Sequence, residues 1–359
     1  MKKDTPYFYH DRPLFGLDIG LGNLKVMQIE PTAHGHKSVV TGYGTTTFTT
    51  DAIKDGVIVK HEAIAQAAHQ LFAKDLVGEI TTRRVAVAIP ASRTFNRTLM
   101  LPKMKKRDIA DAVRLEAEQY IPVPIDQLYL DYSVISEGPH GTELLAVAVP
   151  KKIIDSYMQL TRILGLEPIA METTISASCR LFVQAERNEV PTVLIDLGSV
   201  SSDITIYDNT LVVTGTVPGG GDNFNQQIAQ HLGVTPEEAH IIKTKYGLGY
   251  SKKQKEVTDS LHPILSQLAK EVRRMIRYYE ERGQAPGRKI GQVVTLGGGA
   301  NMPGLSAYLT DELRLPVRMC DTWQHLKFGG LQPPNASEKS MYATAAGLAM
   351  IKPKEVFAA

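Results

Sequence analysis

The chain has 359 residues, of which 43% are hydrophobic and 22% are charged, a globular composition large enough for two domains with separate cores. Its 40 Lys and Arg against 38 Asp and Glu leave a formal net charge of +2, which provides no field to recruit nucleic acid or an anionic membrane surface. Cys179 and Cys320 are its only cysteines and favour a reducing, cytosolic compartment. Neither a secretory signal nor a membrane span is expected, because the longest apolar runs, such as residues 144–149, are only strand-length.

A β-hairpin that carries an aspartate is the first feature expected. Residues 14–19 are predicted to form a strand, residues 20–23 a tight turn, and residues 24–30 a second strand. Asp18 stands near the end of the first strand. The hairpin therefore places a carboxylate beside a glycine-containing bend.

A small α/β module is expected next, inserted in the first domain. Residues 85–165 indicate the order strand, strand, helix, strand, strand, helix. The runs 85–89 and 144–149 are the most apolar and are predicted to be its buried strands.

The aspartate hairpin then returns in the second half of the chain. A strand over residues 193–196 ends in Asp196, a turn covers residues 197–202, and a second strand covers residues 203–207. This weak internal repeat implies two similar domains that face one another across a cleft.

Two further glycine turns follow strands in the second half. Gly219, Gly220 and Gly221 lead into a helix expected from about residue 224 to residue 232. Gly297, Gly298 and Gly299 lead through Met302 into a helix expected near residue 305.

A capped helix lies between these two turns. Thr235 and Glu238 form a capping box around Pro236, and the helix is expected to end at residues 246–247. A polar stretch over residues 251–260 is predicted to separate it from a longer amphipathic helix.

The repeated hairpins suggest a nucleotide site. Small residues at a bend let backbone N–H groups approach phosphate oxygens, because a side chain would block that approach. Asp18 and Asp196 could then hold Mg²⁺ largely through its water ligands. The alternative is that each aspartate only caps its turn. We favour the nucleotide for the repeated pair together with the two further glycine turns.

Two lysines near these motifs have open alternatives. Lys25 either reaches a phosphate as a point charge or lies solvated on a polar strand face. Lys243 and His240 either touch an adenosine or serve the solubility of an exposed helix, and we favour the functional role only for Lys243.

The motifs resemble those of the FtsA/PilM family of actin-like ATPases. Residues 16–20 are similar to the first phosphate motif, residues 194–198 to the second, residues 296–300 to the adenosine motif, and residues 341–350 to the connecting helix. Within the family, the segments typical of the PilM branch are Glu116 to Pro124 and Glu271 to Arg274 with Tyr278 and Tyr279. The resemblance covers roughly residues 13 to 352.

This resemblance implies an α/β, actin-like ATPase fold with two related domains around a nucleotide cleft. The first domain is expected over residues 13–190 plus 338–353 and contains an FtsA-like inserted subdomain over residues 85–165. The second domain is expected over residues 191–337 and contains a helical submodule over about residues 222–290.

ATP and Mg²⁺ are the cofactors that the resemblance implies. The residues expected to contact the nucleotide are Gly20, Gly22, Asn23, Lys25, Gly198, Ser199, Asp203, Gly219, Gly220, Gly221, Lys243, Gly297, Gly298, Gly299 and Met302, and those expected to hold the metal are Asp18 and Asp196. Asn23 stands where the family often has a hydroxyl residue, and His240 stands where it often has a glutamate. Nucleotide contacts weaker than the family norm are therefore expected.

Glu172 is the candidate catalytic residue. It matches the position where actin-like ATPases often carry an acidic residue that orients the attacking water. The alternative is a carboxylate that caps the following helix. The chain is accordingly expected to bind ATP with at most slow ATPase activity.

The resemblance also implies a role in type IV pilus assembly at the inner face of the cytoplasmic membrane. The expected partners are the N-terminal cytoplasmic tail of a PilN-like membrane protein and other pilus assembly components, without nucleic acid and without direct membrane insertion. The tail would dock in a groove between the first domain and its insert, whose exposed-strand candidates are residues 94–101 and 130–136, unless these strands pair with each other.

Two other functions are compatible with the same fold. An FtsA-like division or cytoskeletal filament would be expected to carry a C-terminal amphipathic membrane helix, for which residues 354–359 are too few. A sugar kinase would need a sugar pocket and an Asp base, and no segment argues for either.

Overall fold

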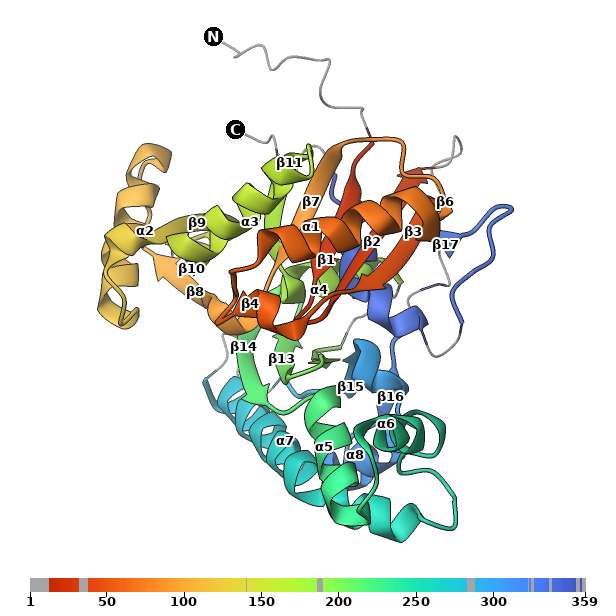
Figure 1. The fold of residues 1–359 in the computed structure, drawn as a ribbon. Coiled ribbons are helices and arrows are strands. Elements are labelled where there is room, and N and C mark those ends of the chain that lie inside the picture. Colours follow the sequence, from red (N-terminus) through yellow and green to blue (C-terminus); the bar gives the residue numbers. More distant parts are fainter. Residues whose placement is uncertain are drawn as a thin grey trace. The chain divides into compact units, whose positions relative to one another are not determined.

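The computed structural model describes residues 13–31, 38–139, 141–185, 190–282, 288–321, 323, 326–335, 338–352 and 356 (Figure 1). The chain divides into two compact units. The first comprises Met1–Pro90, Asp155–Glu186 and Asp321–Ala359, and the second comprises Ala91–Ile154 and Arg187–Cys320.

A mixed sheet forms the centre of the first unit, with the strand order β11-β7-β1-β2-β3-β17 and β6 paired to β3. Its strands are β1 (Phe15–Ile19), β2 (Asn23–Pro31), β3 (Ser38–Thr47), β6 (Val77–Gly78), β7 (Arg84–Ile89), β11 (Glu167–Thr173) and β17 (Leu326–Lys327). β1 is antiparallel to β2 and parallel to β7. All residues of β1 and β7 are buried, as is usual for central strands that are covered on both faces.

Helices cover both faces of this sheet. They are α1 (His61–Gln70), α4 (Thr174–Ala185), α9 (Ala343–Ala349) and the part of α3 (Lys151–Ile163) from Asp155 onward, and the shorter elements are η2 (Thr50–Ala52), η3 (Leu71–Asp75), η7 (Lys339–Tyr342) and the hairpin of β4 (Ile53–Lys54) and β5 (Val57–Ile58). α9 approaches β1 so closely that a Cβ on Gly16 would overlap the carbonyl oxygen of Ala345. The expected helix over residues 341–350 is thus present as η7 and α9.

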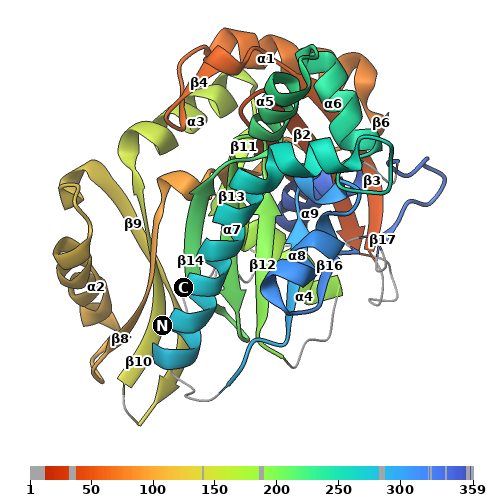
Figure 2. The same cartoon turned by 90° about the horizontal axis from the view of Figure 1, so that it is seen from below.

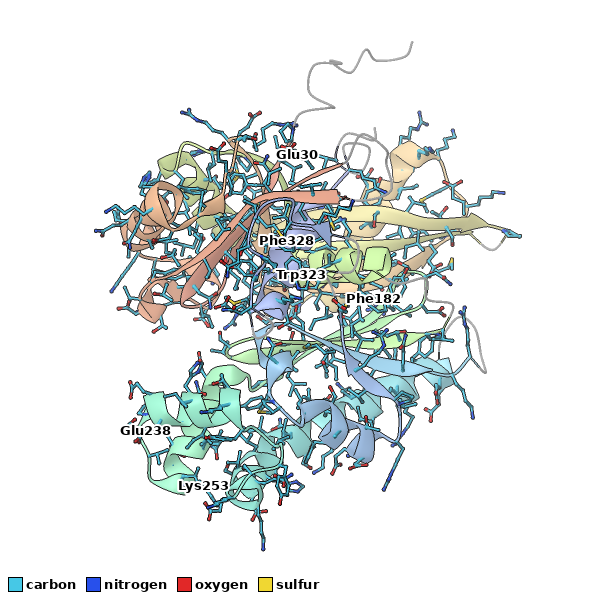
Figure 3. All side chains as sticks on the ribbon, turned by 90° about the vertical axis from the view of Figure 1, so that its right-hand side faces the viewer. Glu30, Phe182, Glu238, Lys253, Trp323 and Phe328 are labelled. Atoms are coloured by element: carbon cyan, nitrogen blue, oxygen red, sulfur yellow. The ribbon has the colours of Figure 1, made fainter. Side chains whose placement is uncertain are left out.

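Aromatic side chains attach the segment before η7 to the sheet. The ring centroid of Phe328 lies 5.3 Å from that of Trp323 and 5.9 Å from that of Tyr43 on β3 (Figure 3). Tyr43 also contacts Tyr342 edge to face, at 5.4 Å. Such contacts fix the outer strands β3 and β17 against each other.

The inserted module is a three-stranded antiparallel sheet covered by one helix (Figure 2). It consists of η4 (Ala91–Arg93), β8 (Phe95–Leu101), α2 (Lys106–Tyr120), η5 (Ile125–Gln127), β9 (Leu128–Gly138) and β10 (Gly141–Pro150), with the strand order β8-β10-β9. α2 buries Ile109 and Val113 against Leu99 and Leu144. The elements follow the expected order, but β7 is a strand of the first unit's sheet, because its apolar run pairs in parallel with β1.

The alternative that the two exposed-strand candidates of this module pair with each other is wrong. β8 and β9 do not pair with each other, because β10 lies between them, so each is an edge strand of the module. The residues Ala91–Ile154 also group with the second unit, and β8 lies beside β14 of that unit. The expected boundaries placed them in the first domain.

The second unit's own sheet has the order β14-β13-β12-β15-β16. Its strands are β12 (Thr192–Leu197), β13 (Ser201–Tyr207), β14 (Leu211–Pro218), β15 (Gln292–Leu296) and β16 (Val317–Met319). β12 is antiparallel to β13 and parallel to β15, as β1 is to β2 and β7. The two sheets therefore share this three-strand pattern, in agreement with the repeat seen in the sequence.

Besides α2 of the inserted module, the second unit contains α5 (Gly221–Leu232), α6 (Pro236–Lys245), α7 (Gln254–Arg282) and α8 (Leu305–Leu313), with η6 (Gly298–Asn301) before α8. The capping box of Thr235 and Glu238 is confirmed, and α5 ends at Gly233 with a φ of 64°. α7 begins earlier than expected, because Val257 and Leu261 are buried and extend its apolar face into the lysine-rich segment. No described helix is long and apolar enough to cross a membrane.

Candidate functional site

The turn between β1 and β2 is tightly closed. The Gly20 N–H donates to the Asn23 carbonyl at 2.8 Å, and a Cβ on Gly20 would lie 2.7 Å from Asn23 Oδ1. Asn23 Oδ1 is itself buried and accepts no hydrogen bond from the described residues. Because a buried acceptor without a partner is costly, this turn is suited to a ligand or water that donates to Asn23.

Asp18 and Lys25 occupy paired positions on β1 and β2. The Lys25 Nζ donates to Asp18 Oδ2 at 2.8 Å, and each side chain is only 10% exposed. Lys25 belongs to a buried ion pair, so the alternative that it lies solvated on a polar strand face is wrong. Tyr157 is also buried nearby, and burial together with the Asp18 charge raises the pKa of its phenol.

Glu172, the candidate catalytic residue, is engaged by Arg180 on α4. The guanidinium donates to both carboxylate oxygens, at 2.5 and 2.7 Å, and also to the Gly347 carbonyl on α9 at 3.2 Å. The helix-capping alternative is wrong, since Thr173 Oγ1 accepts the Ser176 N–H at the start of α4. Arg180 on α4 thus connects Glu172 on β11 with Gly347 on α9.

Two carboxylates face each other in the second unit. Asp196 on β12 is paired with Asp203 on β13, and Thr216 Oγ1 donates to Asp203 at 2.5 Å. Burial, and secondly the charge of Asp196, raise the pKa of Asp203 to about 7, although the Thr216 hydrogen bond opposes this. Such a pair favours a bound cation, because a cation relieves the repulsion between the two carboxylates.

Three predicted glycine turns meet at Asp196. The Gly221 N–H donates to the Gly198 carbonyl at 2.9 Å, and a Cβ on Gly220 would crowd Gly198 and Ser199, whose carbonyl accepts the Asp222 N–H at 2.7 Å. Gly297 has a φ of 78°, and a Cβ there would overlap Asp196 Oδ1. Gly298 and Gly299 open η6, and a Cβ on Gly299 would lie 2.8 Å from that of Leu197. We call these turns, with Asp196 and Asp203, the glycine cradle.

Lys243 joins the glycine cradle from α6. Its Nζ donates to the Gly221 carbonyl at 2.8 Å, the residue is 8% exposed, and burial lowers the pKa of its ammonium while Asp222 opposes this shift. His240 is mostly exposed, in line with its solubility alternative, and partial burial of its ring, followed by the charge of Lys243, lowers its pKa. Met302 packs in the hydrophobic core, so any contact with a nucleotide would come from its backbone.

The family model "Type IV pilus assembly protein PilM" matches residues 16–352. The chain belongs to the PilM family. Solved structures show the same fold: a "PilM-PilN type IV pilus biogenesis complex" is 23% identical with a TM-score of 0.80, covering 94% of this chain and 98% of that one. MreB5 of Spiroplasma citri bound to AMPPNP is 13% identical with a TM-score of 0.55, covering 94% and 95%. The fold is therefore actin-like.

Cell division proteins FtsA are curated relatives of this PilM-family chain. The protein of Pseudomonas aeruginosa is 26% identical over 262 residues, which cover 67% of this chain and 62%, less than two thirds, of that relative. The protein of Borreliella burgdorferi is 23% identical over 348 residues, covering 85% of this chain and 84% of the relative.

The donor set of the PilM-family chain fits a hydrated divalent cation. Among the described residues no three His, Cys, Asp or Glu side chains gather as a metal cluster, so a cation at Asp196 and Asp203 would keep most of its water ligands, as Mg²⁺ does. The predicted site residues are thus divided between the two units, and the sharing of one cation by Asp18 and Asp196 stays a prediction.

Sequence reasoning missed three contributors to the site. Ser202 Oγ donates to the Gly219 carbonyl and holds that turn, Thr216 donates to Asp203, and Arg180 neutralises Glu172. Thr216 could have been found from strand register, since it is paired with Asp203 across β13 and β14. Arg180 carries no local signal beyond an opposite charge eight positions after Glu172.

Proposed function

We propose that this chain binds ATP with Mg²⁺ and couples the bound nucleotide to a PilN-type membrane protein during type IV pilus assembly. The observation that carries the nucleotide part is the glycine cradle, in which three glycine turns pack without side chains around the carboxylates of Asp196 and Asp203. Membership of the PilM family and the actin-like fold support the same conclusion.

Each part of the cradle would have a separate task. Asp196 and Asp203 would hold the cation through its waters, and the bound cation would neutralise phosphate charge. The turn Gly219–Gly221 opens α5, and the partial positive charge at the N-terminus of this helix favours anionic oxygens, although the Gly221 and Asp222 N–H groups already donate to the Gly198 and Ser199 carbonyls. Lys243 would add a positive charge beside Gly221. In the first unit, Lys25 would offer its remaining donors to a phosphate while it stays paired with Asp18.

Hydrolysis would be slow at best. Glu172 accepts a hydrogen bond from Arg180 on each of its carboxylate oxygens, so it is held in a structural ion pair and is not free to act on an attacking water. To orient a water, Glu172 would have to use an oxygen lone pair that Arg180 leaves free, or it would first have to be released from Arg180. The nucleotide would then act as a bound switch rather than as a rapidly consumed substrate.

The cradle is tested by adding one methyl group to it. Gly220→Ala places a Cβ against Gly198 and Ser199, whereas Gly138→Ala places one where no atom lies within 4 Å. Titration calorimetry of the full chain with ATP and Mg²⁺ should show saturable binding that is weakened roughly tenfold or more by Gly220→Ala and is unchanged by Gly138→Ala. Absence of saturable binding by the unmodified chain would overturn the proposal.

The partner would be the N-terminal tail of a PilN-type protein, which would bring this chain to the inner face of the membrane. The likeness to a solved PilM-PilN complex supports the partner, and the positions of β8 and β9 as edge strands of the module support strand addition, with β9 the more accessible of the two because β8 lies beside β14. Leu99 is not a suitable probe of this edge, because it is buried against α2. Met100 and Val134 are 51% and 45% exposed and are better probes.

A labelled tail peptide separates the two edges. Met100→Glu should weaken the peptide if it adds to β8, and Val134→Glu should weaken it if it adds to β9, by roughly tenfold for the edge that is used. Equal and unchanged affinity of both variants would argue against strand addition to the module.

A filament function is the alternative that the FtsA relatives favour. Sedimentation of the full chain with and without ATP discriminates the two functions. Nucleotide-dependent pelleting in the absence of any partner would favour the filament.

A further inference from the structure

A second surface of the chain has no role in the proposed nucleotide or peptide sites. It lies where β8 leads into α2, at Lys103, Lys105, Lys106 and Arg107, which are all exposed and which we call the basic cluster. The overall net charge of +2 does not reveal this surface. No Asp or Glu occurs between Glu79 and Asp108, so positive charge is concentrated in this part of the chain. The charges of the chain are therefore locally segregated, although they are balanced as a whole.

The basic cluster is held in place rather than loosely attached. Met104, in its middle, packs against the core that α2 forms with the module's sheet. The Asp108 N–H donates to the Lys105 carbonyl at 2.9 Å and closes the turn into α2. Because Met104 is anchored, its neighbours Lys103 and Lys105 project into solvent.

These cations lie at the start of a helix, where the partial positive charge of the helix N-terminus makes positively charged side chains unfavourable. Lys105 is the N-cap residue of α2 and makes no capping hydrogen bond, and Lys106 and Arg107 occupy the first turn. The N-terminus of a helix carries partial positive charge, so anionic or capping side chains are favoured there and cations are disfavoured. Asp108 is the one acid in the same turn, so the three consecutive cations are only partly compensated, and a local rule that is broken in this way points to a functional surface.

Few anions of the chain compensate the basic cluster. Lys103, Lys105 and Lys106 form no ion pair with the described residues, and Arg107 lies 3.4 Å from Asp108 in a pair that is exposed on both sides. Glu143, opposite Met100 on the neighbouring strand, accepts a hydrogen bond from Ser136. The positive charge of the basic cluster is thus available to a partner.

We propose that the basic cluster is a contact site for the anionic surface of a lipid membrane, which it binds peripherally and without insertion. Three of its four cations are lysines, whose compact charges suit a diffuse anionic surface, whereas recognition of single carboxylates favours the forked guanidinium of arginine. Residues 102–108 include no aromatic side chain on which a nucleic-acid base could stack. Clusters of four or more basic residues are typical of binding to anionic lipid headgroups.

This proposal does not depend on the nucleotide or on a PilN-type partner. The contact would orient the inserted module toward the membrane, and it would strengthen attachment by any second, weaker contact, since two linked contacts act together. The basic cluster would therefore contribute to localisation even in a chain that has lost its nucleotide.

The test uses a variant that improves the helix while it removes the proposed contact. Lys105→Asp with Lys106→Glu and Arg107→Glu places a good N-cap and two acids in the first turn of α2, so the thermal midpoint should stay equal or rise. The matched control is Lys252→Glu with Lys253→Glu and Lys255→Glu, which makes the same change in net charge at the exposed lysines before and at the start of α7, of which Figure 3 labels Lys253.

Binding of the full chain is measured by co-sedimentation with vesicles of phosphatidylcholine alone and of phosphatidylcholine with phosphatidylglycerol. We expect binding to the anionic vesicles, loss of that binding at high salt, and a decrease of at least tenfold for the basic-cluster variant but not for the control. Equal losses in both variants, equal binding to neutral vesicles, or no vesicle binding would overturn the proposal. Binding of single-stranded DNA instead, with the same sensitivity to the variant, would replace the lipid by nucleic acid.

Discussion

The hairpins β1–β2 and β12–β13 have the same backbone pairing and opposite electrostatics. In each, an aspartate of the first strand is paired with a residue of the second, Asp18 with Lys25 and Asp196 with Asp203. The first pair is a buried ion pair with an N–O distance of 2.8 Å. In the second pair, burial and the Asp196 charge raise the pKa of Asp203 to about 7.

This difference assigns different tasks to two similar structures. The Asp18–Lys25 pair is neutral as it stands, so these two charges need no ligand to be stable, and the cation on Lys25 suits an anionic group. The second hairpin concentrates negative charge, so it is the one that gains stability from a bound cation. Two hairpins with the same backbone pairing therefore need not have the same role in a site.

Removal of the lysine from the first hairpin should have the largest effect on stability. Lys25→Met leaves Asp18 as a buried charge without its partner, and loss of one member of a buried pair costs about 3–5 kcal/mol. Urea unfolding measures this loss. The double variant Asp18→Asn with Lys25→Met should recover most of it, and a single-variant loss below about 1 kcal/mol would contradict the pairing.

Removal of the second hairpin's first carboxylate should affect binding more than stability. Asp196→Ala relieves the repulsion with Asp203 but removes a ligand for the cation's waters. The affinity for ATP in the presence of Mg²⁺, measured by calorimetry, should fall roughly ten- to hundredfold. An unchanged affinity in a folded variant would show that Asp196 does not serve the cation.

The raised pKa of Asp203 predicts a stability that falls with pH. The folded chain holds this proton more tightly than the unfolded chain, whose carboxyl keeps its usual pKa of 3.8, so the contribution is complete below pH 3.8 and is lost as pH rises through about 7. The loss should amount to about 1–2 kcal/mol after allowance for solvent screening.

Comparison with Asp203→Asn isolates this contribution from all other titrations. The difference in unfolding free energy between the two proteins should widen in favour of the variant between pH 5 and pH 8, and added Mg²⁺ should reduce it. Parallel stability curves over this range would show that Asp203 does not titrate there.

The sequence predicts those parts of the molecule that depend on neighbouring residues. The capping box of Thr235 and Glu238 and the glycine turn before α5 are confirmed, because caps and turns are determined within a few positions. The convergence of the glycine turns on Asp196 could be expected from parallel and antiparallel pairing of the strands that precede them.

Other features depend on tertiary contacts that no local pattern reports. The buried run of β7 suits a strand of the module as well as a central strand of the larger sheet, and only its pairing with β1 decides. The lysine-rich start of α7 looks like a loop until Val257 and Leu261 are seen to be buried. Arg180 meets Glu172 only because α4 folds back along β11.

The pair of Glu172 and Arg180 provides the smallest effect and the sharpest test of a catalytic role. It resembles the pair in the first hairpin but is more exposed, 24% and 16% against 10% for both members, so its loss should cost less. Glu172→Gln keeps one oxygen for Arg180, and the free energy of unfolding should fall by about 1 kcal/mol or less, with unchanged nucleotide affinity.

If Glu172 orients water, turnover per folded molecule should fall in this variant and should be kept or raised in Arg180→Met, which frees the carboxylate. Equal turnover in both variants and in the unmodified chain would leave the pair of Glu172 and Arg180 as a structural link between β11, α4 and α9.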